Sequence, residues 1–418
     1  MKSNIQLNRL IHRRLPDSDQ KRMVLLTGAR QVGKTTSLKS CYRNLPNFNL
    51  DAPEYRIQLQ EISSFSWAGS IGNAIIDEVQ KLPSVLDKIK FTFDEGGITF
   101  TVVSGSAQVL PLKSVRESMA GRVFVYEQWP LTLAELCYGA LPDFPELLFS
   151  KLFSGKKTGA VLQNEAAIWP GEKMQQCRDS EEHLLQWGGM PGLLSIDSDR
   201  ERKEWLRSYN LTYLERDLSD LSRMSDLLPF RKFHHLSALR CTGLLNYSSL
   251  AADAGIAVTT ARRYLEYLAV SYQTFLLQPY AKNLTSTVVK TPKIYWSDIG
   301  LLRELTGREG AVDGCLFENH VIAELYKLVK TVFPGLQLYF YRTRSGLELG
   351  CLLVTPEGII GMEIKNRETI KNTDTRTLRL LSEQLDKEWL GGIVVYRGNS
   401  IRELDKNLFA VPSWRLFT

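Results

Sequence analysis

The chain has 418 residues, of which 44% are hydrophobic and 23% are charged, and its formal net charge is +6. This composition excludes a disordered or collagen-like chain, and at roughly 100–200 residues per domain the length predicts two to four domains. The small positive excess permits an anionic partner but does not require one.

The first predicted element is a buried strand over residues 23–27, followed by Gly28-Ala29-Arg30-Gln31-Val32-Gly33-Lys34-Thr35 and a helix over residues 34–41. This is the strand, glycine-rich loop and helix of a P-loop. Its two glycines let backbone N–H groups turn toward phosphate oxygens at the positive end of the helix. We expect Lys34 to contact the β- and γ-phosphates of ATP and Thr35 to bind Mg²⁺. The predicted phosphate-binding residues are Gly28, Ala29, Arg30, Gln31, Val32, Gly33, Lys34, Thr35 and Thr36.

A second strand, Ala74-Ile75-Ile76-Asp77-Glu78, is apolar and ends in two acids. We expect Asp77 to hold Mg²⁺ through water and Glu78 to act as the general base that polarises the attacking water. An acidic pair at a strand end can also be merely solvated, but the P-loop upstream favours the catalytic interpretation.

A third strand over residues 98–103 ends in Ser104-Gly105-Ser106. We expect Ser106 to sense the γ-phosphate, with Ser104 as the second choice. Arg122 follows soon afterwards and could serve as an arginine finger, in cis or across a subunit boundary, or simply form a surface ion pair. A finger acting in trans would require a homo-oligomer.

Further motifs follow along nearly the whole chain. They are Leu50-Asp51, Asp77-Glu78-Val79-Gln80, Gly121-Arg122, Pro130-Leu131-Thr132-Leu133-Ala134-Glu135, Gly188-Gly189-Met190-Pro191, Tyr213-Leu214-Glu215-Arg216-Asp217-Leu218, Lys290-Thr291-Pro292-Lys293-Ile294-Tyr295-Trp296-Ser297-Asp298-Ile299-Gly300-Leu301, Phe317-Glu318-Asn319 and Glu363-Ile364-Lys365. In this order the motifs resemble bacterial and archaeal AAA-type P-loop ATPases that carry a C-terminal domain of unknown function. The expected fold is α/β: an AAA-type ATPase domain (1–180), a helical and winged-helix region (181–281) and a nuclease-like domain (282–418).

Between residues 149 and 180 the chain is polar and its periodicity fades, which predicts a loop or insertion. Residues 182–225 are helical in pattern, and two helices around Gly255 have the outline of a winged-helix unit. Arg262 and Arg263 lie on the second of these helices and could contact DNA. The alternative is that the unit is only a lid or packing module.

The last domain resembles the PD-(D/E)xK nuclease core, which implies Mg²⁺ bound by a helix glutamate, a strand aspartate and the acid of an ExK strand. Glu318 matches the helix, and Glu363 with Lys365 matches the ExK strand. Gly350 stands where the pattern has aspartate. Glu348 shares its face of the strand but lies about 6.5 Å away. We therefore expect a degenerate nuclease site, in which Glu363 and Lys365 form a simple ion pair.

Together the motifs predict a Mg²⁺-dependent ATPase that converts ATP to ADP and phosphate and couples its nucleotide state to a partner, with DNA as one candidate. Two alternatives stay open: an ATP-regulated, metal-dependent nuclease, and an ATP-gated signalling or assembly scaffold. Gly350 argues against the first, and Glu78 argues against a scaffold that never hydrolyses ATP.

We expect a cytoplasmic protein without membrane attachment, because residues 1–14 carry charges and no later segment approaches the ~18 apolar residues of a spanning helix. The six cysteines are scattered, without a CxxC pair. They predict neither structural zinc nor a disulfide framework.

Overall fold

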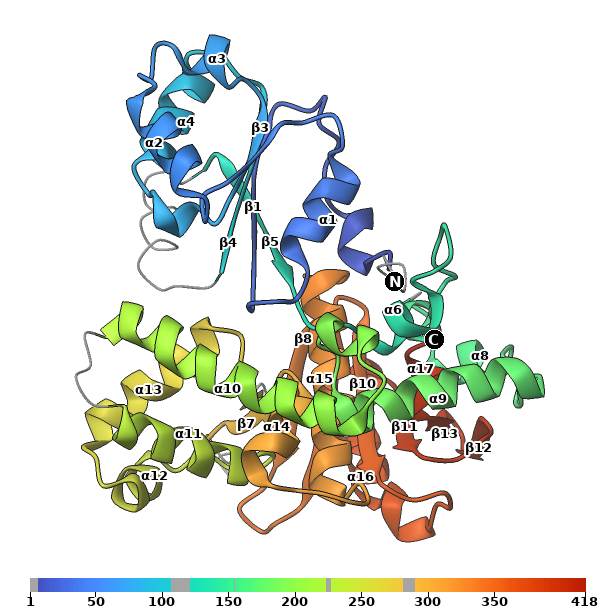
Figure 1. The fold of residues 1–418 in the computed structure, drawn as a ribbon. Coiled ribbons are helices and arrows are strands. Elements are labelled where there is room, and N and C mark those ends of the chain that lie inside the picture. The colour runs from blue at the N-terminus through green and yellow to red at the C-terminus, as the bar shows by residue number, and fades with distance from the viewer. Residues whose placement is uncertain (1–6, 107–120, 154, 223–226, 281–289) are drawn as a thin grey trace.

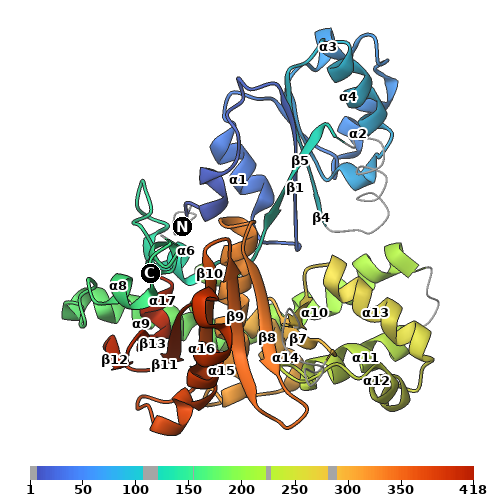
Figure 2. The same ribbon diagram turned by 180° about the vertical axis from the view of Figure 1, so that it is seen from behind.

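The computed structural model describes residues 7–106, 121–153, 155–222, 227–280 and 290–418, with the side chains of residues 106 and 213–222 left out. Figure 1 shows an N-terminal sheet with its helices (blue) standing above a layer of helices (green and yellow) and a second sheet (orange and red). Figure 2 shows the same three parts from behind.

The N-terminal sheet has five parallel strands in the order β2-β3-β4-β1-β5. Its strands are β1 (Arg22–Gly28), β2 (Asn47–Asn49), β3 (Ala74–Asp77), β4 (Phe100–Ser106) and β5 (Val123–Gln128). Because the strands are parallel, their carboxyl ends share one edge of the sheet. The ends of β1, β3 and β4 therefore bring the P-loop, the acidic pair and the serine tip together, with β4 between the other two.

Alternate residues of β1 pack on opposite faces of this sheet. Met23 and Leu25 belong to one hydrophobic cluster, with Leu59 and Leu86, and Val24 and Leu26 belong to another, with Leu38. The helices of this domain are η1 (Leu10–Arg13), α1 (Lys34–Cys41), α2 (Pro53–Glu61), α3 (Trp67–Ser70), η2 (Val79–Lys81) and α4 (Val85–Asp94). A parallel sheet covered on both faces confirms the α/β fold.

The middle of the chain is helical. It contains α6 (Leu133–Tyr138), α7 (Leu148–Lys151), α8 (Thr158–Leu162), α9 (Gly171–Trp187), η3 (Pro191–Ser195), α10 (Asp199–Ser222), α11 (Leu228–Leu239), α12 (Tyr247–Ala254) and α13 (Val258–Val270). The expected loop over residues 149–180 is wrong, because α7, α8 and the start of α9 lie there. Helices of four and five residues are too short to show periodicity, and buried residues such as Phe149 and Leu162 pack into the core of the C-terminal sheet.

Helices α12 and α13 meet at Gly255, which ends α12 with a φ of 71°. Helix α13 is followed by an antiparallel pair, β6 (Thr274–Pro279) and β7 (Lys293–Trp296). Strand β6 also pairs with β8 of the C-terminal sheet, so the helical region and that sheet are continuous.

The second sheet has eight strands in the order β12-β13-β11-β10-β9-β8-β6-β7. Its other elements are α14 (Ile299–Thr306), α15 (Gly314–Thr331), β8 (Gln337–Arg342), β9 (Glu348–Thr355), β10 (Gly358–Lys365), η4 (Asn372–Thr375), α16 (Arg376–Leu385), η5 (Asp386–Glu388), β11 (Trp389–Tyr396), β12 (Arg402–Asp405), β13 (Leu408–Pro412) and α17 (Ser413–Leu416). Cys351 and Leu353 of β9 pack with α15, whereas Leu352 packs with α16. This alternation places the two helices on opposite faces of the sheet.

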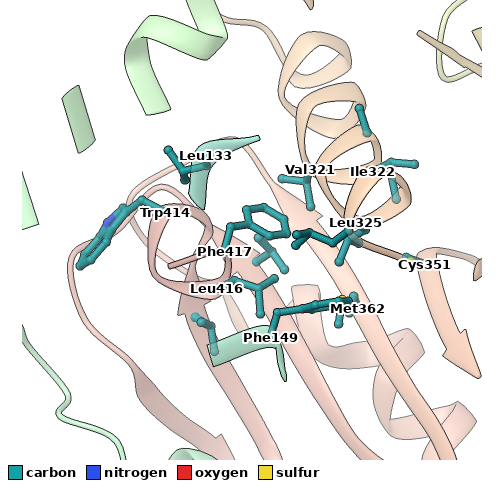
Figure 3. Close-up of a cluster of buried hydrophobic side chains, with 14 of the residues drawn as sticks. Leu133, Phe149, Val321, Ile322, Leu325, Cys351, Met362, Trp414, Leu416 and Phe417 are labelled. Carbon is teal, nitrogen blue, oxygen red and sulfur yellow. The ribbon is translucent and has the colours of Figure 1, made fainter. Parts of the chain in front are cut away.

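Figure 3 shows the core on the α15 face, where Val321, Ile322 and Leu325 lie near Met362 of β10 and Phe417 at the chain end. Leu133 and Phe149, from much earlier in the chain, join the same cluster, so the segment after the N-terminal sheet is anchored in the C-terminal core. None of the helices in the described ranges has the length and apolar character needed to span a bilayer.

Candidate functional site

The predicted P-loop runs from the end of β1 to Lys34, the first residue of α1. A Cβ on Gly28 would lie 2.1 Å from the carbonyl oxygen of Gln128, so no larger residue fits there. Gly33 has a φ of 89°, a backbone conformation that glycine adopts without strain. The ammonium of Lys34 turns back over the loop and donates to the carbonyls of Gly28 (3.1 Å) and Ala29 (2.7 Å).

The P-loop is held from behind by two residues that the sequence analysis did not identify. Gln128, at the end of β5, and Arg9 both donate to the carbonyl of Val32 at 2.8 Å. The buried guanidinium of Arg9 also donates to the carbonyl of Trp129 (2.6 Å) and pairs with Glu135 at 3.0 Å. The N-terminal segment therefore fixes the loop to the start of α6.

Asp77 is fully buried, and three groups converge on its carboxylate. The hydroxyl of Thr35 donates to Oδ2 at 2.5 Å, the hydroxyl of Ser104 donates to Oδ1, and the backbone N–H of Glu78 donates to Oδ1 at 3.0 Å. The structure thus brings the predicted metal-binding pair together. Ser104, the second choice for the sensor, is beside Asp77. The backbone of Ser106 pairs in register with Gly28, and its side chain lies outside the described part of the chain.

Glu78 follows β3 in a left-handed conformation with a φ of 56°, which turns its side chain away from the path of the strand. Gln80 donates to the Glu78 carboxylate. Burial raises the pKa of Glu78, and Asp77 and Asp51 raise it further, against the opposing effects of Lys34 and Gln80. A raised pKa suits a general base.

A cavity of about 950 Å³ lies over the P-loop. One end is lined by P-loop residues and by Glu78, the candidate base: Arg30, Gln31, Gly33, Lys34, Thr35, Thr36 and Glu78. The other end is lined by residues of three separate segments: Leu7, Arg9, His12, Leu131, Pro191, Gly192, Leu194, Ser195 and Asp197. Gly28, Ala29, Val32 and Asp77 lie beneath the lining rather than in it.

His12 at the far end of the cavity is neutral at physiological pH, because burial and then Arg9 lower its pKa to about 4, against Glu135. Its Nδ1 accepts weakly from the Arg9 backbone N–H at 3.4 Å. Its Nε2 is buried and has no hydrogen-bond partner among the described residues. A neutral imidazole that accepts at Nδ1 carries its proton at Nε2, so His12 presents a donor.

The segment Gly188-Gly189-Met190-Pro191 sets the position of the cavity wall formed by residues 191–197. The N–H of Gly189 donates to Asp298 at 2.7 Å, and its carbonyl accepts from the N–H of Leu131 at 2.7 Å. Asp298 also caps α14 by accepting from Leu301 at 3.0 Å. One wall of the cavity is therefore fixed to the C-terminal part of the chain.

Arg122 is not brought to this cavity. It precedes β5, whose far end, Gln128, is the end beside the P-loop. At about 3.3 Å per residue, Arg122 lies about 20 Å away along the strand. Its side chain is partly exposed and pairs with Asp94 at 2.7 Å. The geometry excludes a finger in cis, and a finger in trans stays a prediction.

The residues matched to a nuclease site lie in the C-terminal sheet. The carboxylate of Glu363 pairs with Lys365 at 2.6 Å, as expected for a simple ion pair. Glu318 and Glu348 both contact the ammonium of Lys293, at 3.1 and 2.5 Å. Gly350 supplies no ligand, and no group of three or more His, Cys, Asp or Glu in the described ranges is placed to hold a metal ion. These residues do not fit a nuclease metal.

Comparison with known families agrees with the geometry of the first site. Residues 20–137 match a family model described as an AAA domain. The N-terminal α/β domain is an AAA-type P-loop domain. Residues 178–311 and 313–416 match two domains of unknown function, DUF8612 and DUF4143. Two uncharacterized proteins, from Mycobacterium bovis and Mycobacterium tuberculosis, are each 26% identical over 406 residues, which cover 95% of this chain and 81% of theirs.

Two solved structures are distantly similar. A signal transduction ATPase with numerous domains and a tetratricopeptide repeat sensor, from Pyrococcus horikoshii, is 11% identical with a TM-score of 0.26, and the match covers 76% of this chain and 44% of that protein. AMPPCP-bound DnaA from Aquifex aeolicus is 12% identical with a TM-score of 0.25, over 60% of this chain and 83% of DnaA. This chain thus spans less than half of the first protein.

Proposed function

We propose that this protein is a Mg²⁺-dependent ATPase that converts ATP to ADP and phosphate and couples its nucleotide state to a partner. The observation that carries the proposal is one cavity in which Lys34 and Glu78 face the same space above the Thr35–Asp77 pair. A cation for phosphate, an acid of raised pKa and a hydroxyl–carboxylate pair are the groups that phosphoryl transfer to water requires.

The phosphate end of the cavity supports specific roles. Lys34 has two loop carbonyls as partners and can exchange them for phosphate oxygens, which are stronger, charged acceptors. Thr35 and Asp77 already share a hydrogen bond, and their hard oxygen atoms suit Mg²⁺. When bound there, Mg²⁺ would neutralise charge on the transferring phosphoryl group. Thr36 and Gln31 complete the lining around the phosphates.

Glu78 is the general base in this proposal. It lines the cavity, while Asp77 lies deeper and accepts hydrogen bonds from Thr35 and Ser104. In this proposal Asp77 would bind the metal and Glu78 would activate the water. Gln80 donates to the Glu78 carboxylate and orients it. Ser104 holds Asp77, and the sensor role of Ser106 remains part of the proposal.

The far end of the cavity would take the nucleoside. Leu7, Leu131, Pro191 and Leu194 offer apolar surface of the kind that a base packs against. His12 also lines this end, where its imidazole is neutral. A pocket with apolar walls and a few placed polar groups is the usual form of a small-molecule site.

Two contacts could carry the nucleotide state to the helical region. Tyr272 comes directly after the C-terminal cap of α13, and its hydroxyl donates to Thr27 Oγ1 at 3.2 Å, immediately before the P-loop. The hydroxyl of Tyr209 in α10 donates to the carbonyl of Arg30 at 3.3 Å, within the loop itself. These hydrogen bonds would therefore transmit a shift of the P-loop on nucleotide binding to α10 and to the end of α13.

The direct test is phosphate release from ATP by the purified chain. We expect release in the presence of Mg²⁺ and loss of release when EDTA removes the metal. The proposed phosphoryl transfer needs a divalent cation at the Thr35–Asp77 pair, and EDTA removes it. Turnover that continues unchanged in EDTA would contradict the proposal. Adding single-stranded DNA, duplex DNA or RNA to the same assay identifies the class of partner by stimulation, and the mass in solution with and without ATP decides whether Arg122 acts in trans.

A second proposal is that DNA is a partner, bound through α13. The order α11, α12, α13 and the antiparallel pair β6–β7 is that of a winged helix, in which the second helix of the turn reads DNA. Arg262 and Arg263 are exposed on that helix, and Arg262 stacks over the Tyr247 ring at 4.3 Å. Stacking positions the guanidinium without neutralising its charge.

Replacing Arg262 and Arg263 together with alanine should weaken duplex DNA binding and flatten its salt dependence, by about two in the slope of log K against log salt. Fluorescence anisotropy over a salt series measures this slope. Lys21 and Lys39 of the N-terminal domain, both exposed and outside the cavity lining, are replaced as a pair as the control with the same loss of charge. An unchanged slope in the Arg262 and Arg263 variant would remove α13 as the DNA contact.

A further inference from the structure

Three glutamates from three different elements lie near one another in the C-terminal domain. Glu318 comes from α15, Glu348 begins β9, and Glu363 lies on β10. They are close enough to influence one another: burial raises the pKa of Glu363, and Glu318 and Glu348 raise it further, against Lys365. Their side chains are only partly buried, at 26%, 32% and 15% exposure, so ions in solvent can reach them. No group of three or more His, Cys, Asp or Glu in the described ranges is placed to hold a metal ion, so another cation has to balance these acids.

The ammonium of Lys293 lies between two of these acids. Its Nζ is 3.1 Å from Glu318 Oε1 and 2.5 Å from Glu348 Oε1, and its side chain is only 4% exposed. Lys293 begins β7, which places it at the joint between the helical region and the C-terminal sheet. Tyr295, two residues along the same strand, donates to the same Glu318 oxygen at 2.7 Å. The position of Lys293 is therefore fixed by the strand on which it lies and by its buried contacts with Glu318 and Glu348.

The cluster is balanced in charge. Arg342 pairs with the second oxygen of Glu348 at 3.0 Å, and Lys365 pairs with Glu363 at 2.6 Å. Three carboxylates therefore face three cations, Lys293, Arg342 and Lys365. A divalent cation entering this cluster would have to displace a buried ammonium from two carboxylates, and it would meet no aspartate at Gly350.

Lack of space does not explain the missing acid. A Cβ on Gly350 would make only ordinary contacts, at 3.5 Å with the side chain of Ile364. The position therefore has room for a Cβ. An aspartate there would add a negative charge, but the three cations of the cluster are already paired with its three glutamates.

We propose that the ammonium of Lys293 is the resident cation of this cluster and takes the place of a divalent metal. The three glutamates and their three cations then form a metal-independent ion network that fastens β7 to α15 and β9. This inference does not depend on the proposed ATPase function, because it concerns a separate set of residues.

The first test is thermal unfolding of the nucleotide-free, full-length chain with and without millimolar Mn²⁺. We expect the parent protein and Glu363→Gln to show the same response to Mn²⁺, because the cluster binds none. A rise in Tm that occurs in the parent and is lost in Glu363→Gln would overturn the proposal. This comparison needs no folded variant of Lys293.

The second test removes the ammonium. Lys293→Met should lower Tm by about 5–10 °C, because it leaves Glu318 and Glu348 without their shared cation. Millimolar Mn²⁺ should then restore part of the loss. Lys327→Met is the matched control: Lys327 is also buried and pairs with Glu324 of its own helix at 2.5 Å, outside the three-glutamate cluster, so Mn²⁺ should restore nothing there. A Lys293→Met protein that keeps the parent Tm and ignores Mn²⁺ would overturn the proposal.

Discussion

Replacing Glu78 with glutamine is expected to lower ATP turnover by about 10²–10⁴-fold, the usual contribution of a positioned general base, while ATP still binds. Glutamine keeps the shape of the side chain and an oxygen that can accept from Gln80, but it cannot take a proton from water. Phosphate release under saturating ATP measures the loss. Glu95→Gln, an exposed acid after α4, is the control and should leave turnover unchanged. Equal turnover in the parent and Glu78→Gln would remove Glu78 as the base.

The Glu78→Gln substitution should also change how the free energy of unfolding depends on pH. Burial, the largest effect on Glu78, raises its pKa in the folded chain. Between the ordinary carboxyl pKa and the raised value, the folded state binds more protons than the unfolded state, so the free energy of unfolding falls as pH rises. Glu78→Gln should therefore raise Tm at neutral pH, and the gain should vanish below about pH 4, where both states are protonated. Turnover of the parent should fall on the acid side at a higher pH than an exposed carboxylate would give.

The nucleotide site shows which part of such a site a sequence can reveal. The P-loop and the Asp77-Glu78 pair are short runs whose chemistry is written in adjacent residues, and the structure places them around one cavity. Arg9 and Gln128 both donate to the carbonyl of Val32, although they are 23 and 96 residues away from it. A buried arginine near the start of a chain has no local signal for that role. Only the folded chain makes it visible.

The position of Arg122 could have been predicted from the residues that follow it. Residues 123–126 form an apolar run, and a parallel strand there, beginning after Arg122, puts the arginine at the edge opposite the P-loop. Recognising that strand would have excluded the finger in cis. Lys293 is different, because its sequence neighbours say nothing about carboxylates contributed by α15 and β9.

The cavity walls suggest how binding and the rest of the chain are connected. Residues 191–197 line the end of the cavity that we assign to the nucleoside, and the preceding Gly189 is held by Asp298 at the start of α14. Burial raises the pKa of Asp298, against the hydrogen bonds it accepts from Leu301 and Gly189. A nucleotide that moves this wall must therefore also move an element of the C-terminal region. Contacts at the base end, and not only at the phosphates, would then determine the signal.

Lys34→Ala is expected to weaken ATP binding by about 10²-fold or more, because two charge-assisted hydrogen bonds to phosphate would be lost. Isothermal titration calorimetry with ATP in Mg²⁺ measures the affinity. Lys39→Ala is the matched control, since Lys39 lies on the same helix but is exposed and does not line the cavity. Circular dichroism establishes that both variants are folded. If Lys34→Ala binds ATP as tightly as Lys39→Ala, the ammonium that lies over the P-loop does not hold phosphate, and the assignment of this cavity to ATP fails.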